Sequence, residues 1–96
     1  MKRYRLSRLA EADLESIWAY SEANWGVDQA EAYVRDLQRA IEATAANPRL
    51  GRACDEIRSG YCKRTVGSHV VFYRLGAGII DVIRILHQRM DFDRHL

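Results

Sequence analysis

The fold of this chain is decided by residues 61–86, YCKRTVGSHVVFYRLGAGIIDVIRIL. The stretch holds three apolar runs rich in β-branched and aromatic residues, which favour β-strands. Gly67-Ser68 joins the first two runs and fits a two-residue type II′ hairpin turn, in which glycine supplies the positive φ. A Gly-Ala-Gly connection joins the last two runs. The stretch therefore predicts an antiparallel meander of three strands, at residues 61–66, 69–75 and 79–86.

Two helices are predicted before this meander, because apolar residues recur there at three- and four-residue steps. The first helix lies between Ser7, a suitable N-cap, and Gly26, which tolerates the backbone conformation that follows a helix end. The second runs from Asp28 to Asn47-Pro48, where proline disfavours a helical residue before it. So short a link predicts an antiparallel helical hairpin. The apolar faces include aromatic residues that we expect in the core: Trp18, Trp25 and Tyr33.

A short first strand is predicted at residues 2–6, where polar and apolar residues alternate. The order strand, helix, helix and three strands indicates an α+β domain, with the helical hairpin packed on one face of an antiparallel sheet. Because the two helices return the chain, we expect the first strand to run antiparallel to strand 61–66. The sequence leaves open which sheet edge the first strand joins. Residues 49–60 are polar and glycine-punctuated, which indicates a loop.

Length and composition indicate a single globular domain over residues 1–96. Hydrophobic residues make up 48% of the chain, too many for a disordered protein. The basic start is followed by no long apolar run, so we expect no targeting signal. No window approaches the roughly 18 apolar residues that a membrane helix needs. We therefore expect a cytoplasmic protein with no membrane partner.

The sequence predicts neither a metal site nor a cofactor. Cys54 and Cys62 are the only cysteines, and without a secretion signal we expect free thiols rather than a disulfide. No CxxC or HxxxH pair supplies ligands at zinc spacing. No phosphate-cradling glycine loop and no dinucleotide fingerprint is present either.

Positive charge is concentrated in the second half of the chain. Residues 1–50 hold seven Lys/Arg and eight Asp/Glu, and residues 51–96 hold eight and five, so the net charges are −1 and +3. Seven of the eight basic residues in the second half are arginine, which suits bidentate contacts to phosphate or carboxylate. A solvated sheet face and a surface for an anionic partner both remain open.

Polar and basic residues directly follow the last predicted strand, in RILHQRMDFDRHL (84–96). Strict strand alternation places Arg84 on one face with Val82 and Leu86, a mixed surface that suits a partner. We therefore expect the strand end to form a recognition surface around Arg84, His87 and Arg89.

A nuclease site is the alternative at this strand end. His87 could transfer a proton, since an unperturbed imidazole titrates near pH 6.5. Arg58, Arg64 and Arg74 could then stabilise the charged transition state. Phosphodiester cleavage also needs a second proton carrier, and the sequence shows none. A histidine at a strand end more often hydrogen-bonds the backbone, which is the interpretation we favour.

The chain resembles ParE toxins of the RelE/ParE superfamily along nearly its whole length. Seven segments carry the resemblance: YRLS (4–7), AEADL (10–14), IWAYS (17–21), WG (25–26), NPRLGR (47–52), GSHVVFYR (67–74) and RILHQRMD (84–91). The order strand–helix–helix–strand–strand–strand is also that superfamily's fold.

The resemblance implies the toxin of a type II toxin–antitoxin pair, neutralised by a ParD-like antitoxin in a two-plus-two complex. ParE-like members are associated with poisoning of DNA gyrase, whereas RelE-like members cleave mRNA on the ribosome. The closing segment 87–91 resembles the ParE ending and favours a non-enzymatic gyrase inhibitor. His87 keeps the endoribonuclease open as the alternative. We expect no sequence-specific DNA binding by the toxin alone.

The antitoxin is expected to cover apolar and basic surface that the thin core leaves available. We expect an amphipathic helix for affinity and acidic side chains for specificity. The contact residues predicted on the toxin are Tyr4, Leu9, Arg64 and Arg74.

Overall fold

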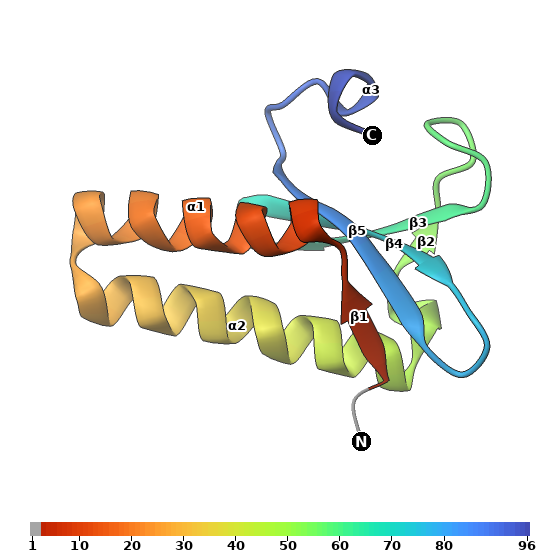
Figure 1. Ribbon diagram of the computed structural model, residues 1–96, viewed down its shortest axis with the longest axis horizontal. Helices are drawn as coiled ribbons and strands as arrows, with labels where there is room; N and C mark the ends of the chain where they lie inside the picture. Colours follow the sequence, from red (N-terminus) through yellow and green to blue (C-terminus); the bar gives the residue numbers. More distant parts are fainter. Residues whose placement is uncertain (1–2) are drawn as a thin grey trace.

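The computed structural model describes residues 3–96 (Figure 1). Its elements are β1 (Tyr4–Leu6), α1 (Arg8–Trp25), α2 (Val27–Ala46), η1 (Pro48–Leu50), β2 (Arg52–Ala53), β3 (Tyr61–Val66), β4 (His69–Leu75), β5 (Ile80–His87) and α3 (Phe92–His95). The predicted α+β class is confirmed, and residue 2 of the predicted first strand lies outside the described residues. Over residues 3–96, no helix has the length and apolar character needed to cross a membrane.

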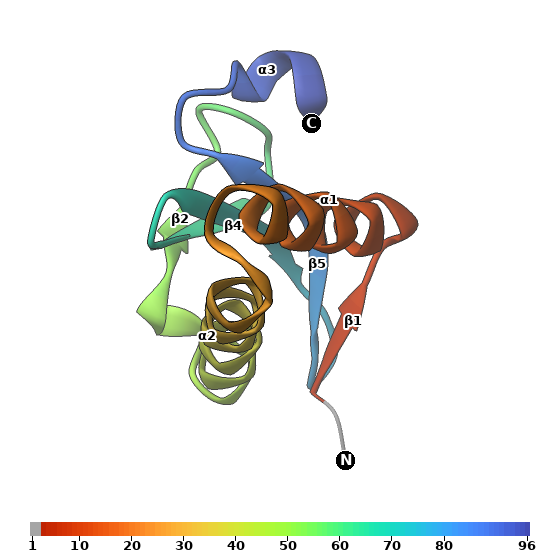
Figure 2. The same cartoon turned by 90° about the vertical axis from the view of Figure 1, so that its left-hand side faces the viewer.

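The predicted helical hairpin is confirmed, and α1 and α2 together cover one face of the sheet (Figure 2). Ser7 caps α1, since its Oγ accepts a hydrogen bond from the backbone N–H of Ala10 at 3.0 Å. Gly26 alone separates the two helices, at a φ of 91° that side-chain-bearing residues rarely adopt. The chain can therefore reverse its direction within one residue.

The strands form one mixed sheet in the order β1-β5-β4-β3-β2. The meander of β3, β4 and β5 is antiparallel, as predicted. In its first turn Gly67 has a φ of 58° and Ser68 a negative φ, which fits the predicted type II′ turn. The predicted direction of the first strand was wrong: β1 pairs with β5 in parallel and therefore also runs parallel to β3.

The direction of β1 was mispredicted because β2 lies hidden in the segment 49–60 that was predicted to be a loop. β2 pairs antiparallel with β3. After the helical hairpin the chain enters β2, which runs antiparallel to β1 as predicted for the next strand. The chain then reverses direction again between β2 and β3, so β3 runs parallel to β1. A strand of two residues shows no alternation by which it could be recognised.

A bulge in β5 changes which face its side chains occupy. Val82 and Arg84 lie opposite neighbouring residues of β4, so Ile83 is an extra residue without a partner there. Val82 packs in the cluster under the helices, whereas Leu86 packs on the opposite face. Arg84 therefore shares a face with Leu86 but not with Val82, which corrects the prediction made from strict alternation.

Apolar side chains pack on both faces of the sheet. The larger cluster lies under the hairpin and contains Ala10, Ile17, Leu37, Ile41, Val71, Tyr73, Ile80, Val82 and Ile85. The smaller cluster on the other face contains Cys54, Val70, Phe72 and Leu86. Phe92 of α3 covers it and meets the ring of Phe72 edge-on, with ring centroids 4.9 Å apart. The hairpin thus covers one cluster and α3 the other.

The predicted core placement is confirmed for Tyr33 alone among the three aromatic residues on the helices. Tyr33 packs against the larger cluster, Trp18 is half-buried and belongs to neither cluster, and Trp25 is 63% exposed. The turn of the hairpin extends beyond the strands (Figure 1). The apolar period of α1 therefore continues past the end of the surface on which it could pack.

α1 also covers the part of β5 that β1 leaves unpaired. β1 reaches only as far as Val82. Beyond that point Ser7 Oγ donates to the carbonyl of Ile83 at 2.6 Å, and Asp13 Oδ2 accepts the backbone N–H of Ile85 at 2.9 Å. These side chains satisfy backbone groups that an open strand edge would expose. They also fix α1 beside the end of β5, where the candidate site lies.

Candidate functional site

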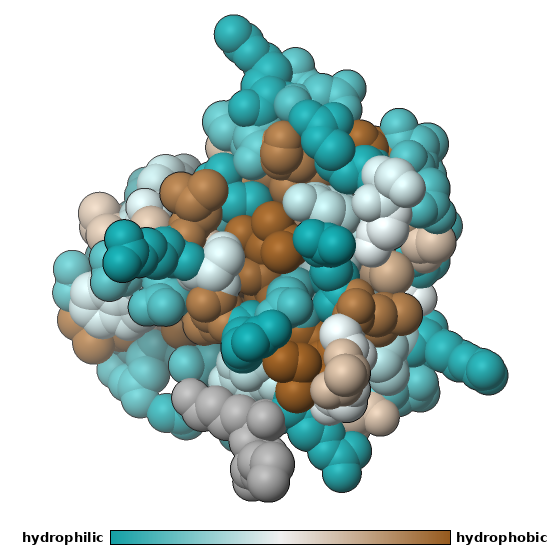
Figure 3. Space-filling view, turned by 45° about the vertical axis from the view of Figure 1, so that its right-hand side comes forward, coloured by the Kyte–Doolittle hydropathy of each residue, from teal (hydrophilic) through white to brown (hydrophobic). Residues whose placement is uncertain are grey.

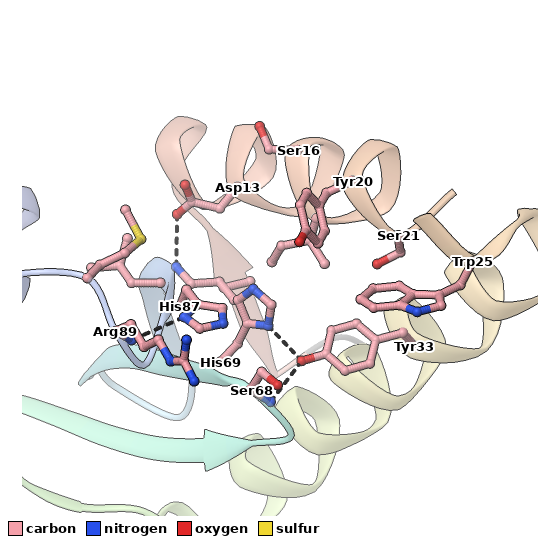
Figure 4. A pocket seen from close by; sticks show the side chains of 14 residues that line it. Asp13, Ser16, Tyr20, Ser21, Trp25, Tyr33, Ser68, His69, His87 and Arg89 are labelled. Carbon is pink, nitrogen blue, oxygen red and sulfur yellow. Dashed lines mark hydrogen bonds between the residues drawn. The ribbon is translucent and has the colours of Figure 1, made fainter. Parts of the chain in front are cut away.

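A cavity of about 730 Å³ opens between α1 and the end of β5 (Figure 4). This volume lies within the range of roughly 300–1,000 Å³ that is common for ligand pockets. Six of the lining side chains bear on function, and they come from α1, α2, β4, β5 and the segment that follows β5: Tyr20, Trp25, Tyr33, His69, His87 and Arg89. Two of the three residues predicted for the recognition surface, His87 and Arg89, thus line one cavity.

Three side chains form a connected row across the cavity. His69 and His87 lie opposite each other on β4 and β5, and their rings meet edge-on with centroids 5.3 Å apart. Tyr33 Oη lies 2.6 Å from Nδ1 of His69 and accepts the backbone N–H of Ser68 at 3.1 Å. The row therefore ties α2 to both strands (Figure 4).

Hydrogen bonds engage Nδ1 of both imidazoles and determine where the ring of His87 carries its proton. Nδ1 of His87 accepts the backbone N–H of Arg89 at 3.1 Å, so the neutral ring carries its proton on Nε2. The Tyr33 hydroxyl lies 2.6 Å from Nδ1 of His69 and also donates to the carbonyl of Val66 at 3.5 Å. The ring of His87 therefore offers the cavity a donor rather than a base, while Nδ1 of His69 is engaged by Tyr33.

The surroundings of His69 favour its neutral form. Burial lowers the pKa of His69, and the nearby charge of His87 lowers it further, while Asp13 acts in the opposite direction. Since an unperturbed histidine is already mostly neutral at pH 7, the lowered pKa keeps His69 uncharged there.

Arg84, the remaining residue predicted for the recognition surface, is committed to an ion pair beside the cavity. Its Nε and Nη2 atoms donate to the two carboxylate oxygens of Asp13 at 2.8 and 2.9 Å, and both side chains are only 14% exposed. The hydrogen bonds that Arg84 donates to Asp13 raise the pKa of Arg84. Nη1 of Arg84 donates to the carbonyl of His95 at 2.9 Å. Arg84 thus positions α1 and α3 on β5.

The arginines predicted for a nuclease site are not gathered around His87. Arg58 donates to two backbone carbonyls of the C-terminal segment, at 3.2 and 2.8 Å. Arg64 donates to a backbone carbonyl and a hydroxyl of α2, both at 3.0 Å. Arg74 lies over the ring of Tyr61, 5.8 Å from its centroid. None of these three arginines lines the cavity.

The residues predicted for the antitoxin contact are spread over the molecule. Leu9 is 57% exposed on α1, whereas Tyr4 packs against the cluster under the hairpin. Arg64 reaches α2 on that side of the sheet, and Arg74 is exposed on the opposite side. The face of the molecule seen in Figure 3 mixes hydrophobic and hydrophilic side chains.

The cysteines offer no activated nucleophile. Cys62 packs with the cluster under the hairpin and Cys54 with the cluster on the opposite face. Burial raises the pKa of both thiols, which disfavours the reactive thiolate. Within residues 3–96, no three His, Cys, Asp or Glu side chains are grouped so that they could hold a metal ion.

The sequence analysis missed the role of His69 because of the bulge in β5. Without the extra residue Ile83, His69 would lie opposite Leu86. The bulge shifts the pairing by one residue and places His87 there instead, on the same face as His69. Strand alternation cannot show such a shift, although the hairpin turn at Gly67-Ser68 already placed His69 at the start of its strand.

Comparison with known proteins supplies the family. The description "ParE toxin of type II toxin-antitoxin system, parDE" belongs to a family model that matches residues 4–92. This chain belongs to the ParE toxin family. The match confirms the resemblance drawn from the seven sequence segments and identifies the chain as the toxin of a ParDE type II system.

Relatives within the family are similar over their full length. Toxin ParE1 of Mycobacterium tuberculosis is 63% identical over 95 residues, covering 98% of this chain and 97% of that protein. Toxin ParE1 of Caulobacter vibrioides is 52% identical over 96 residues, covering 100% and 99%. Toxin ParE of Escherichia coli is 33% identical over 93 residues, covering 95% and 89%.

A solved structure supports the ParE fold. The chain is similar to one in "Chromosomal ParDE TA system from P. aeruginosa", with a TM-score of 0.78, covering 91% of this chain and 96% of that one. The two sequences are 20% identical, so this likeness concerns the fold alone.

Proposed function

We propose that this ParE-family toxin acts in the cytoplasm as a single domain that inhibits DNA gyrase without catalysing a reaction. The proposal rests on one observation: the arginines predicted for a nuclease site do not gather around His87. Arg58, Arg64 and Arg74 each have partners elsewhere, while His87 and Arg89 of the ParE-like ending line a cavity. Such an arrangement supports recognition of a partner rather than cleavage of RNA.

The protonation of His87 also supports a non-enzymatic function. Its Nδ1 already accepts the backbone N–H of Arg89, and its Nε2 carries the proton of the neutral ring. A general base needs a free lone pair within reach of the proton that it removes. His87 has none to offer at Nε2, so it is suited to donate a hydrogen bond to a partner.

A supercoiling assay tests the proposed target. Purified toxin should inhibit or trap gyrase, and Arg89→Ala should weaken this inhibition about tenfold or more, as loss of an interface hot spot does. Arg94→Ala, which removes an exposed arginine of α3, is the matched control and should leave inhibition unchanged. Ribosome-dependent mRNA cleavage with gyrase untouched would refute the proposal.

A ribosome-dependent endoribonuclease is the second candidate, and one observation favours it. His69 and the Tyr33 hydroxyl adjoin His87 and supply the further proton-carrying groups that the sequence did not reveal. If the toxin is a nuclease, His87→Ala should reduce mRNA cleavage by about 10²–10⁴, the usual contribution of a general acid or base. Toxicity that persists in this variant would remove the nuclease candidate.

We also infer that a ParD-like antitoxin neutralises the toxin in a two-plus-two complex. Family membership supports this partner, and Leu9 and Arg74 are exposed and available for contact. Tyr4 and Arg64 would contribute by supporting the surface on which the antitoxin packs.

A further inference from the structure

The cavity at the end of β5 has an aromatic wall that no part of the described chain covers. Tyr20 and Trp25 are 64% and 63% exposed, and their rings meet edge-on with centroids 5.9 Å apart. Leaving two such rings in water forgoes the free energy that their burial would contribute. Exposed Tyr and Trp beside a cavity are typical of interface hot spots, where they bury apolar area on binding.

Two strong hydrogen-bond donors of the same cavity, from His87 and Arg89, are free to meet a ligand. His69 and His87 each have Nδ1 engaged, and the backbone N–H that His87 accepts leaves Nε2–H as the free polar group of its neutral ring. The guanidinium of Arg89 makes no hydrogen bond or ion pair within residues 3–96. Asp13 is the one carboxylate in the lining, and both its oxygens are occupied by Arg84 and a backbone N–H.

The aromatic wall and the free donors together indicate the chemistry of a ligand that would fit this cavity. An apolar side chain could pack on Tyr20 and Trp25, while an anionic oxygen could accept from Arg89 and from Nε2–H of His87. A nucleobase fits less well, because the lining carboxylate is already engaged and the amino groups of adenine, guanine and cytosine would have to be met mainly by hydroxyl oxygens. Carboxylate and aromatic groups occur side by side in acidic protein segments.

We propose that this cavity binds an acidic segment of a partner protein, in which a carboxylate side chain neighbours an aromatic or branched apolar one. The apolar side chain packs on Trp25 and Tyr20, and the carboxylate pairs with Arg89 beside His87. The proposal rests on the proposed function, since His87 and Arg89 belong to the proposed target-recognition surface. The proposal specifies the side chains that the target must present to this cavity, namely a carboxylate beside an apolar group.

Three capped dipeptides test this chemistry on the full-length toxin. N-acetyl-Phe-Glu-amide should bind saturably at concentrations on the order of millimolar, as expected for so small a ligand. It should shift the NMR signals of the Trp25 indole and the His87 ring. Replacing Glu by Gln should weaken binding about fivefold, because the charge-assisted hydrogen bonds are lost. Replacing Phe by Ala should weaken it about tenfold.

Variants locate the site. Arg89→Gln should abolish the preference for Glu over Gln, and Trp25→Ala should abolish the preference for Phe over Ala. Arg94→Gln and Glu22→Gln change exposed charges outside the cavity and should leave both preferences intact. Unchanged circular dichroism would show that each variant is folded, and His87→Gln, which keeps a side-chain N–H donor, gives a second test of the polar side.

The outcomes separate this inference from the proposed gyrase target. Equal binding of the Glu and Gln dipeptides, shifts confined to residues outside the cavity, or no saturable shift up to about 20 mM would overturn the site. Gyrase inhibition without dipeptide binding would overturn the site and leave the target. Dipeptide binding without gyrase inhibition would support the site and overturn the target.

Discussion

Gly51 occupies a position that admits no side chain. A Cβ atom there would overlap Oη of Tyr73 and lie 2.7 Å from the carbonyl oxygen of Lys63. Tyr73 is fully buried and donates to the carbonyl of Pro48 at 2.8 Å, so it cannot move aside without losing that bond. Gly51→Ala should therefore lower the free energy of unfolding by about 1–3 kcal/mol, measured by urea denaturation.

The matched control for Gly51 is Gly76→Ala. The nearest atoms to a Cβ at Gly76 are 3.4 Å away, and its φ is not positive. This variant should cost much less than Gly51→Ala. If both variants lowered the free energy of unfolding equally, the overlap with Tyr73 would make no contribution of its own, and the argument for Gly51 would be refuted.

His69 should make the stability of the toxin depend on pH. Its pKa is lowered in the folded protein, so the unfolded chain binds this proton more tightly. The contribution of His69 is complete above its unfolded pKa of about 6.5 and is lost as pH falls from there towards the folded pKa. We expect the free energy of unfolding of the wild type to decrease below about pH 6.5.

His69→Gln should flatten this part of the pH profile in urea denaturation measured between about pH 5 and 7.5. His95→Gln alters an exposed histidine of α3 and should leave the slope as it is in the wild type. A His69→Gln profile with the full wild-type slope would assign the pH dependence to other groups.

Among the elements, α1 shows how a helix can complete a sheet. Its Asp13 accepts the backbone N–H of Ile85 on the open edge of β5 and pairs with Arg84, whose side chain is 14% exposed. Asp13→Asn keeps the shape and one acceptor oxygen but leaves Arg84 without its counter-charge. Loss of one member of a buried pair is strongly destabilising, and we expect a cost of about 3 kcal/mol by urea denaturation.

The exposed ion pair on α2 is the control for Asp13. Glu31 lies 2.7 Å from Arg35, and their side chains are 58% and 55% exposed. Glu31→Gln should cost about 0.5 kcal/mol or less. Comparable losses from the two variants would contradict a special role for the pair that ties α1 to β5.

The elements differ in how far the sequence could predict them. α1, α2 and the meander have long periodic patterns and clear turn residues, and they were predicted to within one or two residues. β2 has two residues and the bulge adds one, so neither produces a pattern. These two small features decide the direction of β1 and the contact between His69 and His87. The candidate site could therefore be predicted only as far as His87 and Arg89.

At the scale of the whole molecule, a thin sheet is covered on one face by the hairpin and on the other by the short C-terminal segment. Arg84 contacts the helices on both faces, since it pairs with Asp13 of α1 and donates to the carbonyl of His95 in α3. The cavity opens where α1 passes the end of β5. A partner that binds there contacts helix and sheet together, so its binding and the stability of the fold are linked.

The proposed antitoxin should stabilise the toxin by mass action. A partner that binds only the folded state adds about 2.7 kcal/mol at a free concentration of 100 times Kd. For a domain of this size, that gain raises Tm by roughly 10–20 °C. Thermal melts of the toxin with and without its ParD-like partner measure the shift. Leu9→Asp should reduce it, while Val27→Asp, which places the same charge at an exposed apolar residue of α2, should not. An unchanged Tm at saturating partner would refute the antitoxin interaction, because a partner that binds only the folded toxin must stabilise it.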